Sequence, residues 1–104
     1  MTRFESTDRA RMRRQLLDRG RVLATLLADL LAGKPVVVPL PIAAKPGMKP
    51  EEKLRAALDQ VEARRRLLDA GDDAFGRCTV CAADLGTVAL GEMPWADRCQ
   101  LHAR

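Results

Sequence analysis

Residues 78–102 read CTVCAADLGTVALGEMPWADRCQLH, and this stretch contains all three cysteines of the chain and its single histidine. The four residues are spaced as CxxC, then seventeen residues, then CxxH. Each short pair places two soft ligands on one tight turn, and the long spacer can bring the two turns together. Three thiolates and one imidazole are typical of a closed tetrahedral zinc site. The spacing therefore predicts that Zn²⁺ is bound by Cys78, Cys81, Cys99 and His102. Buried apolar cysteines beside a surface histidine are the alternative.

The predicted zinc ion would be structural. Four protein ligands leave no open coordination position for water or a substrate. No nucleophile–base pair is recognisable either, so we do not expect an enzyme. Pro94 is expected to begin a short helix that places Cys99 and His102 on one face. For Trp95, packing over the zinc lobe and anchoring of a partner are both open. The small core of this lobe is expected to consist of Phe75, Leu85, Val88, Leu90, Met93, Trp95 and Leu101.

Two amphipathic helices are predicted before this region. Apolar residues recur at intervals of three and four over residues 7–32 and again over residues 50–70, with a proline at the first position of the second helix. Residues 6–8 (Ser-Thr-Asp) are candidate N-caps for the first helix. Gly33 and Gly71 follow the two helices as stop signals.

The two apolar stripes match one another as an antiparallel pair, in which facing positions have residue numbers with a constant sum. The residue numbers of Arg19 and Arg65 have the same sum, so these two arginines would form one polar layer among the apolar ones. Their side chains could extend to acidic neighbours or mark a binding surface. The fold class expected is all-α, with an antiparallel coiled-coil hairpin in residues 1–70 and a small zinc-finger lobe in residues 71–104. Two helices in a compact bundle are the alternative. The pairs that sum to 84 are Leu16 with Leu68, Leu23 with Val61, Leu26 with Leu58, and Leu30 with Leu54.

The segment between the helices, residues 33–49, is rich in proline and basic. Residues 33–50 hold five of the six prolines, three lysines and no acidic residue. Proline blocks helix formation, and a connection of this length is either functional or mobile. Its apolar part, PVVVPLPI at residues 35–42, could fold back onto the hairpin or dock on a partner, and a disordered loop is the alternative.

Composition excludes several classes of protein. The chain has 104 residues, 47% of them hydrophobic and 31% charged, which is too apolar for a disordered chain and too charged for a membrane protein. The net charge of +4 lies mostly in the first helix and the loop, which could support nucleic-acid contact. However, no aromatic residues are interleaved there, and the run Arg64–Arg66 is most simply a solvated helix face. We expect no sequence-specific binding to nucleic acid.

The cellular location expected is the cytoplasm. The first residues lack the basic stretch and apolar run of a signal peptide, and the longest apolar stretch, residues 35–44, is about half of what a membrane-spanning helix requires. An odd number of cysteines without an export signal argues against disulfides and for a reducing compartment.

The C-terminal residues resemble the DksA/TraR family of bacterial zinc-finger transcription regulators. The resemblance covers residues 67–104 and is carried by FGRCxxC at residues 75–81, LGEMPWA at residues 90–96, and CxxH at residues 99–102. The family usually has four cysteines at this spacing, and His102 takes the place of the fourth. The resemblance implies a structural zinc ion and a helical hairpin that enters the secondary channel of RNA polymerase. Some members of the family respond together with guanosine tetraphosphate.

The loop departs from the family pattern, in which acidic residues at the hairpin tip act near the polymerase active site. Residues 33–50 have no Asp or Glu, so a direct contact with RNA polymerase would have a different output. An adaptor that binds another protein through Val36–Ile42 is the second hypothesis, and a nucleic-acid binder is the third. Target genes, an effector and the oligomeric state are open.

Overall fold

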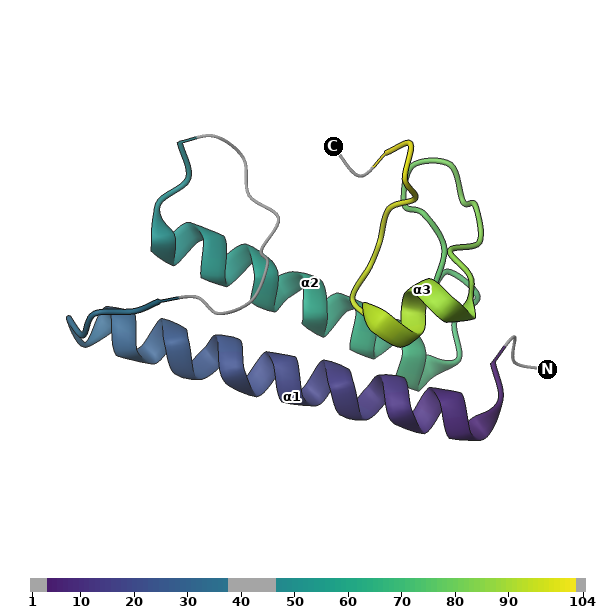
Figure 1. Ribbon diagram of the computed structural model, residues 1–104, viewed down its shortest axis with the longest axis horizontal. Coiled ribbons are helices and arrows are strands. Elements are labelled where there is room, and N and C mark those ends of the chain that lie inside the picture. The colour runs from purple at the N-terminus through teal and green to yellow at the C-terminus, as the bar shows by residue number, and fades with distance from the viewer. Residues whose placement is uncertain (1–3, 38–46, 103–104) are drawn as a thin grey trace.

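The computed structural model describes residues 4–37 and 47–102, which are mostly helical. Three helices are present in them: α1 (Ser6–Leu31), α2 (Pro50–Ala70) and α3 (Thr87–Glu92). α1 and α2 lie side by side in opposite directions, and the C-terminal segment folds over the end of the pair where α1 begins (Figure 1). The described residues contain no β-strand beyond a single isolated bridge between Arg77 and Asp84. The prediction of a helical protein with two long packed helices is confirmed.

α1 and α2 end close to the glycines that the sequence offers as stop signals. Gly33 and Gly71 have φ angles of 79° and 67°, in the left-handed region that glycine adopts without steric cost. Their N–H groups and those of the next residues donate to the last carbonyls of each helix. At the start of α1 the N-cap residue is Glu5, with no side-chain cap bond. The expected caps at residues 6–8 are therefore wrong, because the helix already includes all three.

The hairpin core contains the inward apolar positions that the spacing predicted. The buried ones are Met12, Leu16, Leu23, Leu54, Ala57, Val61 and Leu68, while Leu26, Leu30 and Leu58 are partly buried. Val61 contacts the backbone of α1 at Gly20, where a side-chain carbon would lie 3.6 Å from Cγ1 of Val61. Gly20 is one turn before Leu23, the expected partner of Val61. The paired layers that sum to 84 stay a prediction.

The C-terminal lobe (residues 71–102 of the described chain) shares its core with the hairpin. Phe75 and Leu90 are buried in the same cluster as the helix side chains. The ring of Phe75 meets that of Phe4 edge-on, with the centroids 5.7 Å apart. The lobe therefore does not depend on an interior of its own, because α3 lies against α1 and the hairpin forms the opposite wall. The core expected from the sequence is wrong for three exposed residues, Val88, Met93 and Leu101.

The expected arginine layer is half right. Arg19 is buried, with 6% of its surface exposed, but the buried arginine on α2 is Arg64 at 8%, and Arg65 is only partly buried. Arg64 lies three residues after Val61 and four before Leu68, which places it on the buried stripe of the helix. The interpretation of residues 64–66 as a solvated face is therefore wrong for Arg64.

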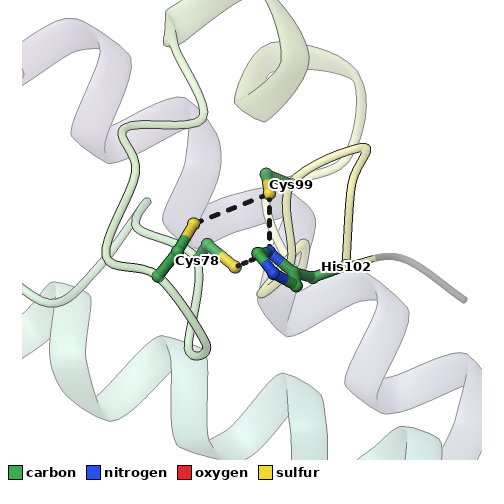
Figure 2. A group of neighbouring side chains, drawn as sticks. Cys78, Cys99 and His102 are labelled. Carbon is green, nitrogen blue, oxygen red and sulfur yellow. Dashed lines mark hydrogen bonds between the residues drawn. The ribbon is translucent and has the colours of Figure 1, made fainter.

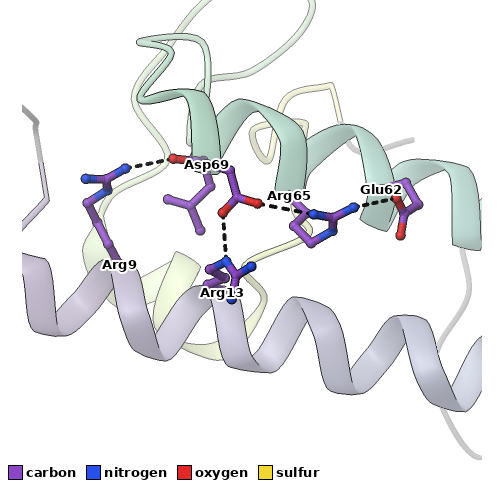
Figure 3. A network of polar contacts seen from close by, with 6 residues as sticks. Arg9, Arg13, Glu62, Arg65 and Asp69 are labelled. Atoms are coloured by element: carbon purple, nitrogen blue, oxygen red, sulfur yellow. Dashed lines mark hydrogen bonds and ion pairs between the residues drawn. The ribbon is translucent and has the colours of Figure 1, made fainter.

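Arg65 extends sideways, which was one of the alternatives that the sequence left open. Its Nη2 lies 2.9 Å from Oε2 of Glu62, and its Nη1 lies 3.1 Å from Oδ2 of Asp69. The other oxygen of Asp69 accepts a hydrogen bond from Nε of Arg13 at 2.9 Å, so one carboxylate joins the two helices (Figure 3). Arg9 adds a further link between the helices, donating from Nη2 to a backbone carbonyl of α2 at 2.8 Å.

Replacing Asp69 with asparagine is expected to lower the free energy of unfolding by about 1 kcal/mol at low salt, because a network of partly exposed ion pairs is lost. The loss should shrink in about 0.5 M salt, where exposed charges are screened. Denaturant unfolding at the two salt concentrations measures both effects. Asp59→Asn is the matched control, since Asp59 is exposed on α2 and has no ion pair among the described residues. Equal losses in the two variants would contradict the prediction.

None of the helices in the described ranges is long and apolar enough to cross a membrane.

Candidate metal centre

The first pair of predicted ligands, Cys78 and Cys81, lies on a tight turn. The N–H of Cys78 donates to the carbonyl of Ala83, and the N–H of Ala82 donates to the carbonyl of Cys78, both at 2.9 Å. Ala82 has a φ of 61°, in the left-handed region that residues with a side chain rarely adopt. These bonds reverse the chain immediately after Cys81 and bring both sulfur atoms to one side.

The second pair, Cys99 and His102, is held by another turn, in which the N–H of His102 donates to the carbonyl of Cys99 at 3.0 Å. The residues from Pro94 to His102 form turns, so the helix expected to begin at Pro94 is wrong. The two halves are joined by the N–H of Thr79, which donates to the carbonyl of Asp97 at 2.8 Å. Backbone bonds thus set both turns and their relative position.

The four predicted ligands converge at one point. Their candidate ligand atoms all lie within 4.8 Å of one another. Nδ1 of His102 lies 3.1 Å from Sγ of Cys99 and 3.6 Å from Sγ of Cys78, and Figure 2 shows the three side chains directed toward one another. Sγ of Cys81 lies 3.7 Å from Sγ of Cys99, and none of the three cysteines is in a disulfide. Cys78 is buried, whereas Cys81 is exposed.

The environment favours thiolate at two of the three sulfurs. Burial acts to raise the pKa of Cys78, but backbone N–H groups, among them that of Val80 at 3.4 Å, outweigh it and lower the pKa to about 6. The contact between Cys99 and His102 lowers the pKa of Cys99 and raises that of His102. At Cys81 a backbone N–H acts to lower the pKa, but burial and the two neighbouring sulfurs raise it overall. Thiolate is the form of cysteine that binds metal ions.

Trp95 connects this site to the hairpin, which the sequence did not reveal. Its ring is half-buried, and Cζ of Arg19 on α1 lies 3.8 Å from the ring centroid. In the sequence, Arg19 is an odd residue in an apolar stripe, and Trp95 fits either a residue of the lobe core or an anchor for a partner. No local pattern relates two residues so far apart in the chain.

Cys78, Cys81, Cys99 and His102 can therefore hold a metal ion together. Comparison of the chain with protein-family models, with curated proteins and with solved structures gives no match in any of the three. The helical hairpin and the Cys₃His cluster are the two features on which a functional proposal rests.

Proposed function

We propose that the Cys₃His cluster binds Zn²⁺ as a structural ion. In a tetrahedron with Zn–S of about 2.3 Å and Zn–N of about 2.05 Å, the S–S edge is about 3.8 Å and the S–N edge about 3.6 Å. The Cys81–Cys99 and Cys78–His102 separations of 3.7 Å and 3.6 Å agree with these edges. The Cys99–His102 separation of 3.1 Å has to lengthen. With four protein ligands no coordination position is open, so the ion would stabilise the lobe and would not act on a substrate.

Acidification is expected to release the zinc ion. Metal binding requires deprotonated cysteines and a neutral imidazole, and protons compete for the same atoms. The bound fraction should be complete at neutral pH and should fall as the pH decreases, with release essentially complete by about pH 4. A chromophoric chelator added during a pH titration measures the release, and full occupancy at the acid end would contradict this ligand set.

We propose further that the protein is a DksA/TraR-like transcription regulator, which acts in the bacterial cytoplasm by direct contact with RNA polymerase. The observation that supports it best is the combination of a long helical hairpin with a Cys₃His lobe at its base (Figure 1). The residues of the lobe resemble that family, and the end of α1 and the start of α2 lie at the far end of the hairpin from the lobe (Figure 1). Since residues 33–50 contain no Asp or Glu, the expected output differs from that of an acidic tip.

Binding to purified core RNA polymerase tests this proposal. The wild-type protein should co-elute with the polymerase at micromolar concentration, and a variant with residues 34–49 replaced by a short Gly-Ser linker should not. Arg14→Ala, an exposed change on α1 away from the loop, is the control and should bind normally. A wild-type protein that fails to bind core polymerase would overturn the proposal.

A protein-interaction adaptor is the second candidate, and the exposure of Val37 favours it. This side chain is 86% exposed at the start of the Val/Pro-rich loop, so a partner could contact it directly. A photo-crosslinking residue in place of Val37, expressed in the native host, separates the two candidates. Crosslinks to proteins other than the polymerase subunits would support the adaptor, and crosslinks to the polymerase would support the regulator.

A further inference from the structure

Beside the shared apolar core, the C-terminal lobe contacts a stripe of polar residues on α1. Arg11, Gln15 and Arg19 follow one another at intervals of four, which places them on one face of the helix. Nε2 of Gln15 donates to the carbonyl of Gly91 at 3.4 Å. A side-chain carbon at Gly91 would lie 3.5 Å from Nη2 of Arg11, so the end of α3 lies directly on this face.

Arg19 lies in an unfavourable setting for a charge. It lies between Leu16 and Leu23, both fully buried, and only 6% of its own surface is exposed. Burial lowers the pKa of Arg19, as expected when a cation leaves water. The indole of Trp95 at 3.8 Å offers a favourable cation–π contact, which gains strength when the pair is desolvated.

Trp95 in turn depends on the turns that carry the metal ligands. It lies between Pro94, which is fully buried, and Asp97, whose carbonyl accepts the hydrogen bond from Thr79. Thr79 directly follows the ligand Cys78, and Cys99 comes two residues after Asp97. Trp95 is therefore two residues away from the hydrogen bond that holds the two ligand-bearing turns together.

We infer that metal binding and docking of the lobe on α1 stabilise each other through the stack of Trp95 on Arg19. This rests on the proposed metal centre. The two effects are linked thermodynamically. A metal ion that orders the ligand turns increases the equilibrium constant for docking of the lobe on α1, and docking increases the affinity for the metal ion by the same factor. Metal loading would then control how firmly Trp95 covers the guanidinium of Arg19.

Zinc affinity and Trp95 fluorescence test the coupling in the full-length protein. Trp95 is the only tryptophan and the chain has no tyrosine, so the emission reports this ring alone. Removal of zinc from the wild-type protein should shift the emission to longer wavelength and increase quenching by acrylamide. Arg19→Ala should weaken zinc binding about tenfold in competition with a chelator, a coupling of ordinary size. Arg14→Ala, exposed on the same helix, should leave the affinity unchanged.

If the Arg19→Ala protein does not form its helices, Gln15→Ala is the second variant that tests the coupling. This change removes the hydrogen bond to the carbonyl of Gly91 and leaves Arg19 in place. It should weaken zinc binding by a smaller factor than Arg19→Ala does. Unchanged affinity in the folded docking variants, or unchanged emission of the wild-type protein after zinc removal, would overturn the coupling while leaving the metal centre in place. A wild-type protein that binds no zinc would overturn both.

Discussion

A Cys99→Ser variant is expected to lose stoichiometric zinc and the fold of the C-terminal lobe together. Structural zinc contributes on the order of 10–16 kcal/mol to small zinc-finger peptides, which is as large as the whole stability of a small domain. Cys99 lies close to two other candidate ligands, with separations of 3.1 Å to His102 and 3.7 Å to Cys81. Elemental analysis of the pure protein measures the zinc content, and the emission of Trp95 reports the fold of the lobe.

The matched control is Gln100→Ala, which changes an exposed residue in the same turn and leaves all four ligands in place. This variant should keep one zinc ion per chain and the native emission. Full zinc content in the Cys99→Ser protein would remove Cys99 from the ligand set. Native emission in a zinc-free Cys99→Ser protein would show that the lobe folds without the ion.

The second large effect is expected in the hairpin core, at Leu16. This side chain is fully buried between the helices, so Leu16→Ala removes apolar contacts and leaves a cavity, at a cost of about 2–5 kcal/mol. In a domain whose total stability is about 5–15 kcal/mol, such a loss can unfold much of the protein at ambient temperature. Thermal and denaturant unfolding followed by circular dichroism measures the change.

Leu17→Ala is the control, because it removes the same atoms from the next residue of the same helix. Leu17 is 37% exposed and forms no part of the buried cluster, so its loss should cost less than about 1 kcal/mol. Similar losses in the two variants would mean that the hairpin does not bury Leu16 as described.

Much of the fold was predictable because the local signals agree. A proline at the first position of α2 and a glycine after each long helix mark boundaries that the structure reproduces to within one residue. The three- and four-residue spacing of leucines identifies the buried faces. The cluster of four candidate metal ligands could also be predicted from the sequence, because CxxC and CxxH pairs in so short a chain are most often metal-binding.

The remaining features depend on contacts that no local pattern specifies. Arg64 and Arg65 both fit the spacing of the α2 stripe, and Arg65 turns outward where Glu62 and Asp69 on its own helix bind it. Apolar residues such as Val88 predict a larger interior for the lobe than the structure has, because the lobe shares its core with the hairpin and Val88 is exposed. The stack of Trp95 on Arg19 joins distant segments and follows from tertiary packing alone.

The lobe lies near one end of the hairpin, so it divides α1 into a part that contacts the lobe and a part that extends beyond it. The contacts described between α3 or Trp95 and α1 fall at Arg11, Gln15 and Arg19, and the helix continues to Leu31 beyond them. Seven residues added to each long helix past this point would extend the stalk by about 10 Å and keep the same faces inward. The length of the hairpin can therefore change in whole heptads while the lobe with the candidate metal centre stays the same.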